Sequence, residues 1–159
     1  MILTDSQFKL ARHFLPKNAI VTVDPATKAI TKVESSEWLT PPVKANPAAT
    51  PPVVAVPGVR KTFTDAELTA AYADVTLSFD ELFQMIPRSE RDAIASQGMN
   101  DRTAAIILNE FRGHLKIRLG DDQTKTSLHY LATQIVPPAT APALSPETLA
   151  AILGPLLGL

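Results

Sequence analysis

A proline-rich run between residues 40 and 58 limits what this chain can fold into more than any other feature. Proline fixes the backbone angle φ, lacks an N–H donor and pushes the preceding residue into extended conformations. A helix is therefore excluded here, and we expect an extended, polyproline-like arm over residues 40–60, with a reach on the order of 50 Å. Such an arm divides the chain into two lobes. Six of the fourteen prolines lie in the run: Pro41, Pro42, Pro47, Pro51, Pro52 and Pro57.

The residues before the arm, 1–39, are expected to form a small lobe. The segment Thr4-Asp5-Ser6-Gln7 fits a capping box and predicts a short amphipathic helix over about 5–14. Two β-branched runs then flank a turn at Asp24-Pro25, which predicts a β-hairpin. An isolated hairpin is marginally stable in water, so this one is expected to lean on another element. The two runs are residues 19–23 and 29–33.

Residues 61–136 have the pattern of a helical bundle, because capping residues precede apolar stripes at short intervals. Gly98 is expected to end the third helix in a left-handed conformation. We predict the longest helix over about 102–118, with Leu115 in its apolar stripe, and a further helix over about 123–135, with Ile135 facing inward. The predicted N-terminal caps are Thr64, Ser78, Ser89, Asp101 and Asp121.

The last segment, 137–159, is an apolar tail rich in proline and leucine, in which Ser145-Pro146-Glu147 predicts the start of a short helix. Its most apolar stretch, 149–159, is well short of the roughly 20 residues that span a bilayer. The predicted fold class is mainly α. We expect a small orthogonal helical bundle preceded by a short helix, a β-hairpin and the extended arm.

Composition removes several classes of function. The 159 residues include 15 Lys+Arg against 16 Asp+Glu, so no net charge favours nucleic acid or an anionic membrane. The absence of cysteine excludes disulfides, thiolate metal sites and cysteine catalysis. The sequence does not open on a basic segment followed by an apolar run, so we expect no secretory signal.

No arrangement of side chains predicts catalysis. The histidines His13, His114 and His129 belong to no nucleophile motif, and no two of them have the spacing of a helical zinc site. The acid pairs Asp80-Glu81 and Asp121-Asp122 fall in predicted first helical turns, where the helix dipole favours them. We therefore expect no enzyme, no catalytic residue, no metal and no cofactor.

Arg112, Lys116 and Arg118 form the one concentrated basic stretch, and Arg112 and Lys116 are expected one turn apart on the same helical face. One interpretation is a phosphate or nucleic-acid contact of a regulatory adaptor. The other is that these cations stabilise the C-terminal end of a helix, with nearby acids offsetting them. A helix-turn-helix over 89–115 is not favoured, because the first half of its second helix is too apolar to contact base edges.

The arm and the tail are the segments expected to contact other proteins. A proline-rich arm loses little entropy on binding, and its valines could fill shallow pockets. The leucines of the tail must be buried, either in the core of this chain or against another subunit. The presence of the arm, a second candidate contact segment, favours burial against another subunit. The candidate contact residues are Val43, Val53, Val54, Val56, Leu153, Leu156, Leu157 and Leu159.

Three segments carry a resemblance to a known class of proteins: Leu77–Phe83, Pro87–Ile94 and Leu144–Glu147. Over about 77–153 the chain resembles small helical proteins encoded among the virion structural genes of tailed bacteriophages. The basic stretch of this chain departs from their pattern. The resemblance implies a structural or assembly role in a phage particle, in the virion or the host cytoplasm, with no catalytic residues. Its partners would be other structural subunits, identical or different. The alternative is the adaptor that binds nucleic acid through residues 112–118.

Overall fold

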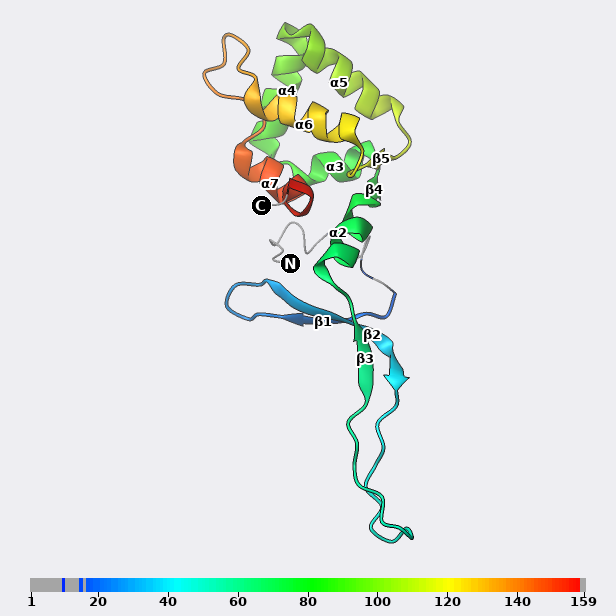
Figure 1. Ribbon diagram of the computed structural model, residues 1–159. Coiled ribbons are helices and arrows are strands. Elements are labelled where there is room, and N and C mark those ends of the chain that lie inside the picture. Colours follow the sequence, from blue (N-terminus) through cyan, green and yellow to red (C-terminus); the bar gives the residue numbers. More distant parts are fainter. Residues whose placement is uncertain (1–9, 11–14, 16, 158–159) are drawn as a thin grey trace.

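The computed structural model describes Leu10, Leu15 and residues 17–157. A helical body lies at one end of the molecule, a three-stranded sheet lies next to it, and a long arm extends from the sheet at the other end (Figure 1). The described residues form six helices and two sheets, so the prediction of a mainly α fold is wrong and the chain is mixed α/β. Apart from Leu10, the helix predicted over about 5–14 lies outside the described residues.

The larger sheet is antiparallel with the order β1-β2-β3. The predicted hairpin is confirmed, because Val21 of β1 pairs with Val33 of β2. Its turn is closed by Asp24, whose Oδ1 accepts a hydrogen bond from the backbone N–H of Ala26 at 2.7 Å. Two parts of this sheet escaped prediction, the polar second half of β2 and the short, charged β3, since neither alternates clearly between apolar and polar residues. The strands are β1 (Ile20–Val23), β2 (Ile30–Thr40) and β3 (Val59–Thr62).

The arm is a hairpin that leaves the sheet from β2 and returns to it in β3, not a single extended strut that separates two lobes. Val43 and Val56 exchange backbone hydrogen bonds of 2.9 and 3.0 Å, and so do Asn46 and Val53. The bridging residues are all non-proline and the prolines flank them, because a bridge of this kind needs an N–H that proline lacks. The expected extended backbone is therefore present, but it is folded back on itself.

The helical body contains six helices and a two-stranded sheet, in which β4 (Thr76–Leu77) pairs with β5 (Ile117–Arg118). The capping boxes predicted at Thr64 and Ser78 are present in full, with Glu67 and Glu81 as the reciprocating residues. The helices are α2 (Asp65–Ala73), α3 (Phe79–Met85), α4 (Arg88–Asn100), α5 (Arg102–Gly113), α6 (Asp122–Thr133) and α7 (Pro146–Leu157).

Several predicted helix ends are wrong for identifiable reasons. α4 passes through Gly98, where a Cβ atom would lie 2.7 Å from Leu108 Cδ1, so this glycine allows α4 and α5 to pack closely. α5 ends at Gly113 and not near residue 118, because the chain leaves the helix to form β5. Leu115 is consequently exposed, and Ile135, which lies beyond the end of α6, is exposed as well.

One hydrophobic core joins the helices and includes Ile30 and Val33 of the sheet. The tail belongs to this core, because α7 buries Ile152 and Leu153. The Tyr72 hydroxyl donates a buried hydrogen bond of 2.7 Å to the carbonyl oxygen of Ile152, and burial raises the pKa of Tyr72. The Glu90 carboxylate of α4 accepts hydrogen bonds from Ser145 and Thr148 at the start of α7. The residues with least exposure are Tyr72, Leu77, Leu82, Ile94, Ala104, Leu119, Leu144 and Ile152.

Candidate functional site

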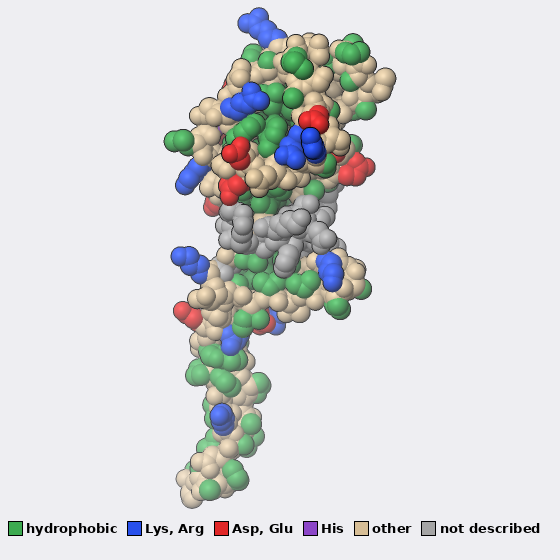
Figure 2. All heavy atoms as spheres, turned by 180° about the vertical axis from the view of Figure 1, so that it is seen from behind, with side chains coloured by type: hydrophobic (Ala, Val, Ile, Leu, Met, Phe, Trp, Pro, Cys, Tyr) green, Lys and Arg blue, Asp and Glu red, His purple; other side chains and the backbone are tan. Residues whose placement is uncertain are grey.

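The arm is the most exposed apolar feature of the described chain. Figure 2 shows hydrophobic side chains along both legs of the arm, from the sheet to the tip. Val54 is 77% exposed and Leu39 is 67% exposed, and none of the body helices covers the legs. Lys44 is the only charged residue between residues 38 and 59. The apolar residues exposed on the arm and at its base are Trp38, Leu39, Val43, Val53, Val54, Val56 and Val59.

The base of the arm is held by an aromatic and cationic stack. The guanidinium carbon of Arg60 lies 3.7 Å from the centroid of the Trp38 ring. The same guanidinium donates hydrogen bonds to the carbonyl oxygens of Ser35 and Ser36. A Cβ atom at Gly58 would lie 2.5 Å from the Trp38 ring, so the ring lies directly against the returning leg. The direction in which the arm leaves the sheet is thereby fixed by packing.

Between its two bridges, the arm has backbone donors that bind nothing within the described chain. Lys44 and Ala45 on one leg and Val54 and Ala55 on the other donate no hydrogen bond from their N–H groups to any described residue. Unpaired backbone donors on an extended segment are available to pair with another molecule. The arm therefore offers both apolar side chains and hydrogen-bond donors.

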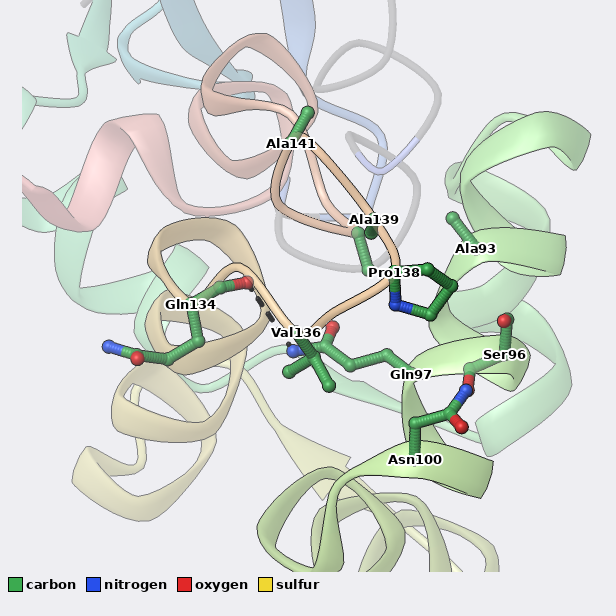
Figure 3. A pocket seen from close by; sticks show the side chains of 10 residues that line it. Ala93, Ser96, Gln97, Asn100, Gln134, Val136, Pro138, Ala139 and Ala141 are labelled. Atoms are coloured by element: carbon green, nitrogen blue, oxygen red, sulfur yellow. Dashed lines mark hydrogen bonds between the residues drawn. The ribbon is translucent and has the colours of Figure 1, made fainter.

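A pocket of about 280 Å³ lies between α4 and the segment that joins α6 to α7 (Figure 3). The α4 side of the pocket is one helical face, since its residues follow the spacing i, i+3, i+4 and i+7. No ionisable side chain of the described residues lines it. The lining consists of Ala93, Ser96, Gln97, Asn100, Gln134, Val136, Pro138, Ala139, Ala141 and Ala143.

Gln97 is the buried polar group of this pocket, with a side chain only 6% exposed. Its Nε2 donates a long hydrogen bond of 3.4 Å to the carbonyl oxygen of Gln134, and Figure 3 shows the side chain reaching from α4 toward Gln134. Its Oε1 is buried and has no hydrogen-bond partner among the described residues. An unsatisfied buried acceptor costs about 1–3 kcal/mol, which a donor from a ligand would recover. Sequence reasoning missed this pocket. The available signal was the absence of large apolar residues from this face of α4.

The basic stretch does not form one surface. Arg112 lies on α5 over the Phe79 ring, at 5.6 Å from its centroid, while Lys116 follows the end of the helix. Arg118 lies in β5 and forms an ion pair with Asp74. The expectation that Arg112 and Lys116 share a helical face is therefore wrong, because the helix ends between them. Lys116 and Arg118 line a second pocket, of about 250 Å³, together with Glu110, Asp121 and His114.

The histidines and the paired acids, the remaining candidates for a catalytic or metal site, have structural roles or do not lie together. His114 follows the end of α5 and His129 lies on α6, both exposed, while His13 lies outside the described residues. Asp121 caps α6, and Asp122 forms an ion pair with Lys125. Among the described residues, no group of three or more His, Asp or Glu side chains has the arrangement of a metal site. No described helix has the length and apolar character to cross a membrane.

The Asp101 carboxylate joins the start of α5 to α6. It accepts hydrogen bonds from the backbone N–H groups of Thr103 and Ala104 and from the Tyr130 hydroxyl at 2.8 Å. These bonds lower the pKa of Asp101, with the bond from Tyr130 as the largest cause, and the same bond raises the pKa of Tyr130. This arrangement stabilises a helix end and links α5 to α6.

The candidate contact residues of the tail fall into different environments. Leu153 is 1% exposed and belongs to the core of this chain, and Leu156 is partly buried against that core. Leu157 is exposed at the end of α7, and Leu159 lies outside the described residues. The four valines of the arm, in contrast, are all exposed. The arm is thus the larger of the two candidate contact surfaces.

Comparison with known proteins identifies no relative of this chain: no family model, no curated protein and no solved structure matches it.

Proposed function

We propose that this chain is a non-enzymatic structural or assembly component of a multi-subunit particle, and that its arm contacts a neighbouring subunit. The observation that carries the proposal is the arm itself, a hairpin with exposed valines on both legs that none of the described helices covers. Exposed apolar surface of this kind on a projecting element is typical of a protein interaction site. The resemblance of residues 77–153 to tailed-phage structural proteins favours a virion as the particle.

The architecture supports this role because shape and contact are assigned to different parts of the chain. The helical body has one continuous core that includes α7, so it holds its shape without a partner. The arm is anchored at its base by Trp38 and Arg60 and contributes little to that core. A neighbour that covers the arm recovers the hydrophobic free energy that the isolated chain forgoes, about 25 cal/mol for each Å² of apolar surface buried.

The basic stretch gives less support to a nucleic-acid adaptor. Arg118 is paired with Asp74, and Glu110 and Asp121 line the same pocket as Lys116. Phosphate binding gains from uncompensated cations, because released counterions drive it. These three cations are instead distributed over a helix, a loop and a strand, with acids close to two of them.

The test is the solution mass of the purified chain, measured by light scattering over a range of concentrations. Three proteins are compared: the full chain, a variant in which Asn-Gly replaces residues 42–57, and the full chain with Val43, Val53, Val54 and Val56 changed to Thr. The Thr variant keeps the β-branched shape of the four side chains and replaces one methyl group of each by a hydroxyl. Leu115→Thr, which changes an exposed leucine outside the arm, is the control.

We expect the full chain and the Leu115→Thr control to assemble into species larger than the monomer, and both arm variants to stay monomeric. Protease digestion gives a second readout, because an uncovered arm is cleaved in the monomer and protected in the oligomer. A full chain that remains a rigid, protease-resistant monomer at every concentration would contradict the proposal.

A further inference from the structure

The geometry points to the pocket between α4 and residues 134–143 of a second copy of this chain as the binding site for the arm. In this arrangement the arm places its valines and prolines in the pocket, and the Gln97 side chain, whose Oε1 is covered in the unbound chain, turns to accept a hydrogen bond from an arm N–H group. The inference rests on the proposed function, and it adds the identity of the neighbour and the place of contact.

The chemistry of the pocket matches that of the arm. The pocket is lined by alanine, valine and proline, with Ser96, Gln97 and Asn100 and the Gln134 carbonyl oxygen as its polar groups. A volume of about 280 Å³ suits a few small side chains and falls just below the roughly 300–1,000 Å³ of typical small-molecule sites. The arm consists mainly of small apolar residues, and a neutral lining imposes no charge that it would have to neutralise.

The hydrogen-bonding needs of the two surfaces are complementary. Gln97 Oε1 is a buried acceptor without a donor. The arm carries four N–H donors without an acceptor in the described chain, on Lys44, Ala45, Val54 and Ala55. Pairing a donor from the arm with Gln97 Oε1 satisfies one hydrogen-bonding group on each surface. A partner without the matching donor would leave the buried acceptor unpaired, so this pairing makes the contact specific.

The charge of the chain favours contact between unlike ends. Residues 17–63, which include the described sheet and the arm, carry 6 Lys+Arg and 3 Asp+Glu, a net charge of +3. Residues 64–159, which include the pocket, carry 7 Lys+Arg and 12 Asp+Glu, a net charge of −5. Two identical ends therefore repel each other and unlike ends attract. Asp92, exposed on α4 next to Ala93, is the acid available to Lys44 beside the pocket.

The arm does not reach the pocket of its own chain, because the arm and the segment that joins α6 to α7 lie at opposite ends of the molecule (Figure 1). Contact between an arm and the pocket of another copy uses two different surfaces and is therefore head-to-tail. Repetition of a head-to-tail contact closes into a ring if the rotation permits and otherwise continues as a filament. Both products are suited to a repeating particle.

Complementation between two variants tests the inference with the full-length fold. The first variant has Asn-Gly in place of residues 42–57 and keeps its pocket. The second is Ser96→Trp, which keeps its arm and fills the pocket from an exposed position on α4. The matched control is Ala95→Trp, an exposed α4 residue that does not line the pocket. Thermal unfolding of each variant, followed by circular dichroism, checks that the fold is intact.

We expect each of the first two variants to be monomeric alone, their equimolar mixture to have the mass of two chains and no more, and Ala95→Trp to assemble like the unchanged chain. Gln97→Met, which removes the acceptor and keeps the length of the side chain, is expected to weaken assembly about fivefold, the effect of one hydrogen bond. A synthetic peptide of residues 41–58 is expected to bind the arm-deleted variant and not its Ser96→Trp derivative.

The possible failures are distinguishable. If the unchanged chain assembles, loses assembly with its arm, and still assembles as Ser96→Trp, the arm binds elsewhere: the inference fails while the proposed function stands. If the unchanged chain assembles no better than the arm-deleted variant, the proposed function fails with it. A mixture of the two variants that stays monomeric while the unchanged chain assembles also overturns the inference.

Discussion

Phenylalanine in place of Tyr72 removes one oxygen atom from the contact between α2 and α7, and the consequence depends on pH. At pH 7 the change deletes the buried 2.7 Å hydrogen bond to the Ile152 carbonyl and is expected to lower the free energy of unfolding by about 1 kcal/mol. At high pH the sign reverses. Burial raises the pKa of Tyr72 above its ordinary value of 10.0, so the unfolded chain loses the phenolic proton first. Above pH 10 the folded state therefore holds more protons than the unfolded state, and stability falls by about 1.4 kcal/mol per pH unit.

The two effects cancel near pH 10.7, to about half a unit, and above that pH Tyr72→Phe is expected to be the more stable protein. The assay is urea unfolding followed by circular dichroism at pH 7, 9, 10 and 11. Tyr130→Phe is the control, because it changes the only other tyrosine and leaves the decline due to Tyr72 in place. Parallel loss of stability in the unchanged chain and in Tyr72→Phe from pH 9 to 11 would refute the packing of α7 on Tyr72.

Three further predictions concern the body of the fold, each measured by chemical unfolding. Leu153→Ala is expected to cost about 2–5 kcal/mol, because Leu153 is 1% exposed; a cost below 1 kcal/mol would show that α7 is not part of the core. Gly120→Ala is expected to lower the free energy of unfolding by about 1–3 kcal/mol, since its Cβ would lie 2.5 Å from the Ala73 carbonyl oxygen. Gly113→Ala, whose Cβ would meet no atom within 4 Å, is expected to raise it by up to about 1 kcal/mol. Equal effects of the two substitutions would contradict this prediction. Asp101→Ala is expected to cost about 1–2 kcal/mol at pH 7. Because the pKa of Asp101 is lowered in the fold, its contribution is lost as the pH falls through that lowered value, so the difference in the free energy of unfolding should narrow in acid. The same hydrogen bond raises the pKa of Tyr130 above its ordinary value of 10.0, so the difference should also narrow as the pH rises above that value.

Sequence patterns predicted correctly those features that depend on interactions between residues close together in the chain. The caps at Thr64, Ser78, Asp101 and Asp121 are in place, because a cap is an interaction between residues two or three positions apart. The cap predicted at Ser89 is wrong, because α4 begins at Arg88 and Pro87 takes the N-cap position without a side-chain hydrogen bond. The first hairpin was found for the same reason, since its turn is closed by the side chain of Asp24. Helix ends were predicted less well where a contact between distant residues decides them.

The candidate site depends on contacts that a local reading does not contain. The return of the arm requires Val43 to meet Val56, and β3 exists only because β2 continues to Thr40. The pocket at Gln97 exists because residues 134–143 fold back over α4, more than thirty positions along the chain. The valines of the arm were identified from composition alone, while the pocket required the structure.

The prolines of the arm bear on how it can associate. An exposed hairpin with bare edges tends to add strands from any similar chain, which leads to aggregation. Here the six prolines interrupt both legs, and the only exchanged backbone bonds are those at Val43–Val56 and Asn46–Val53. Extension of the sheet by a second arm would need an unbroken row of N–H donors, which proline removes. The arm can still bind through its side chains and a few isolated N–H donors. A pocket with a single unsatisfied acceptor is suited to bind such a surface. The composition of the arm therefore favours a contact with one defined site over open-ended strand pairing.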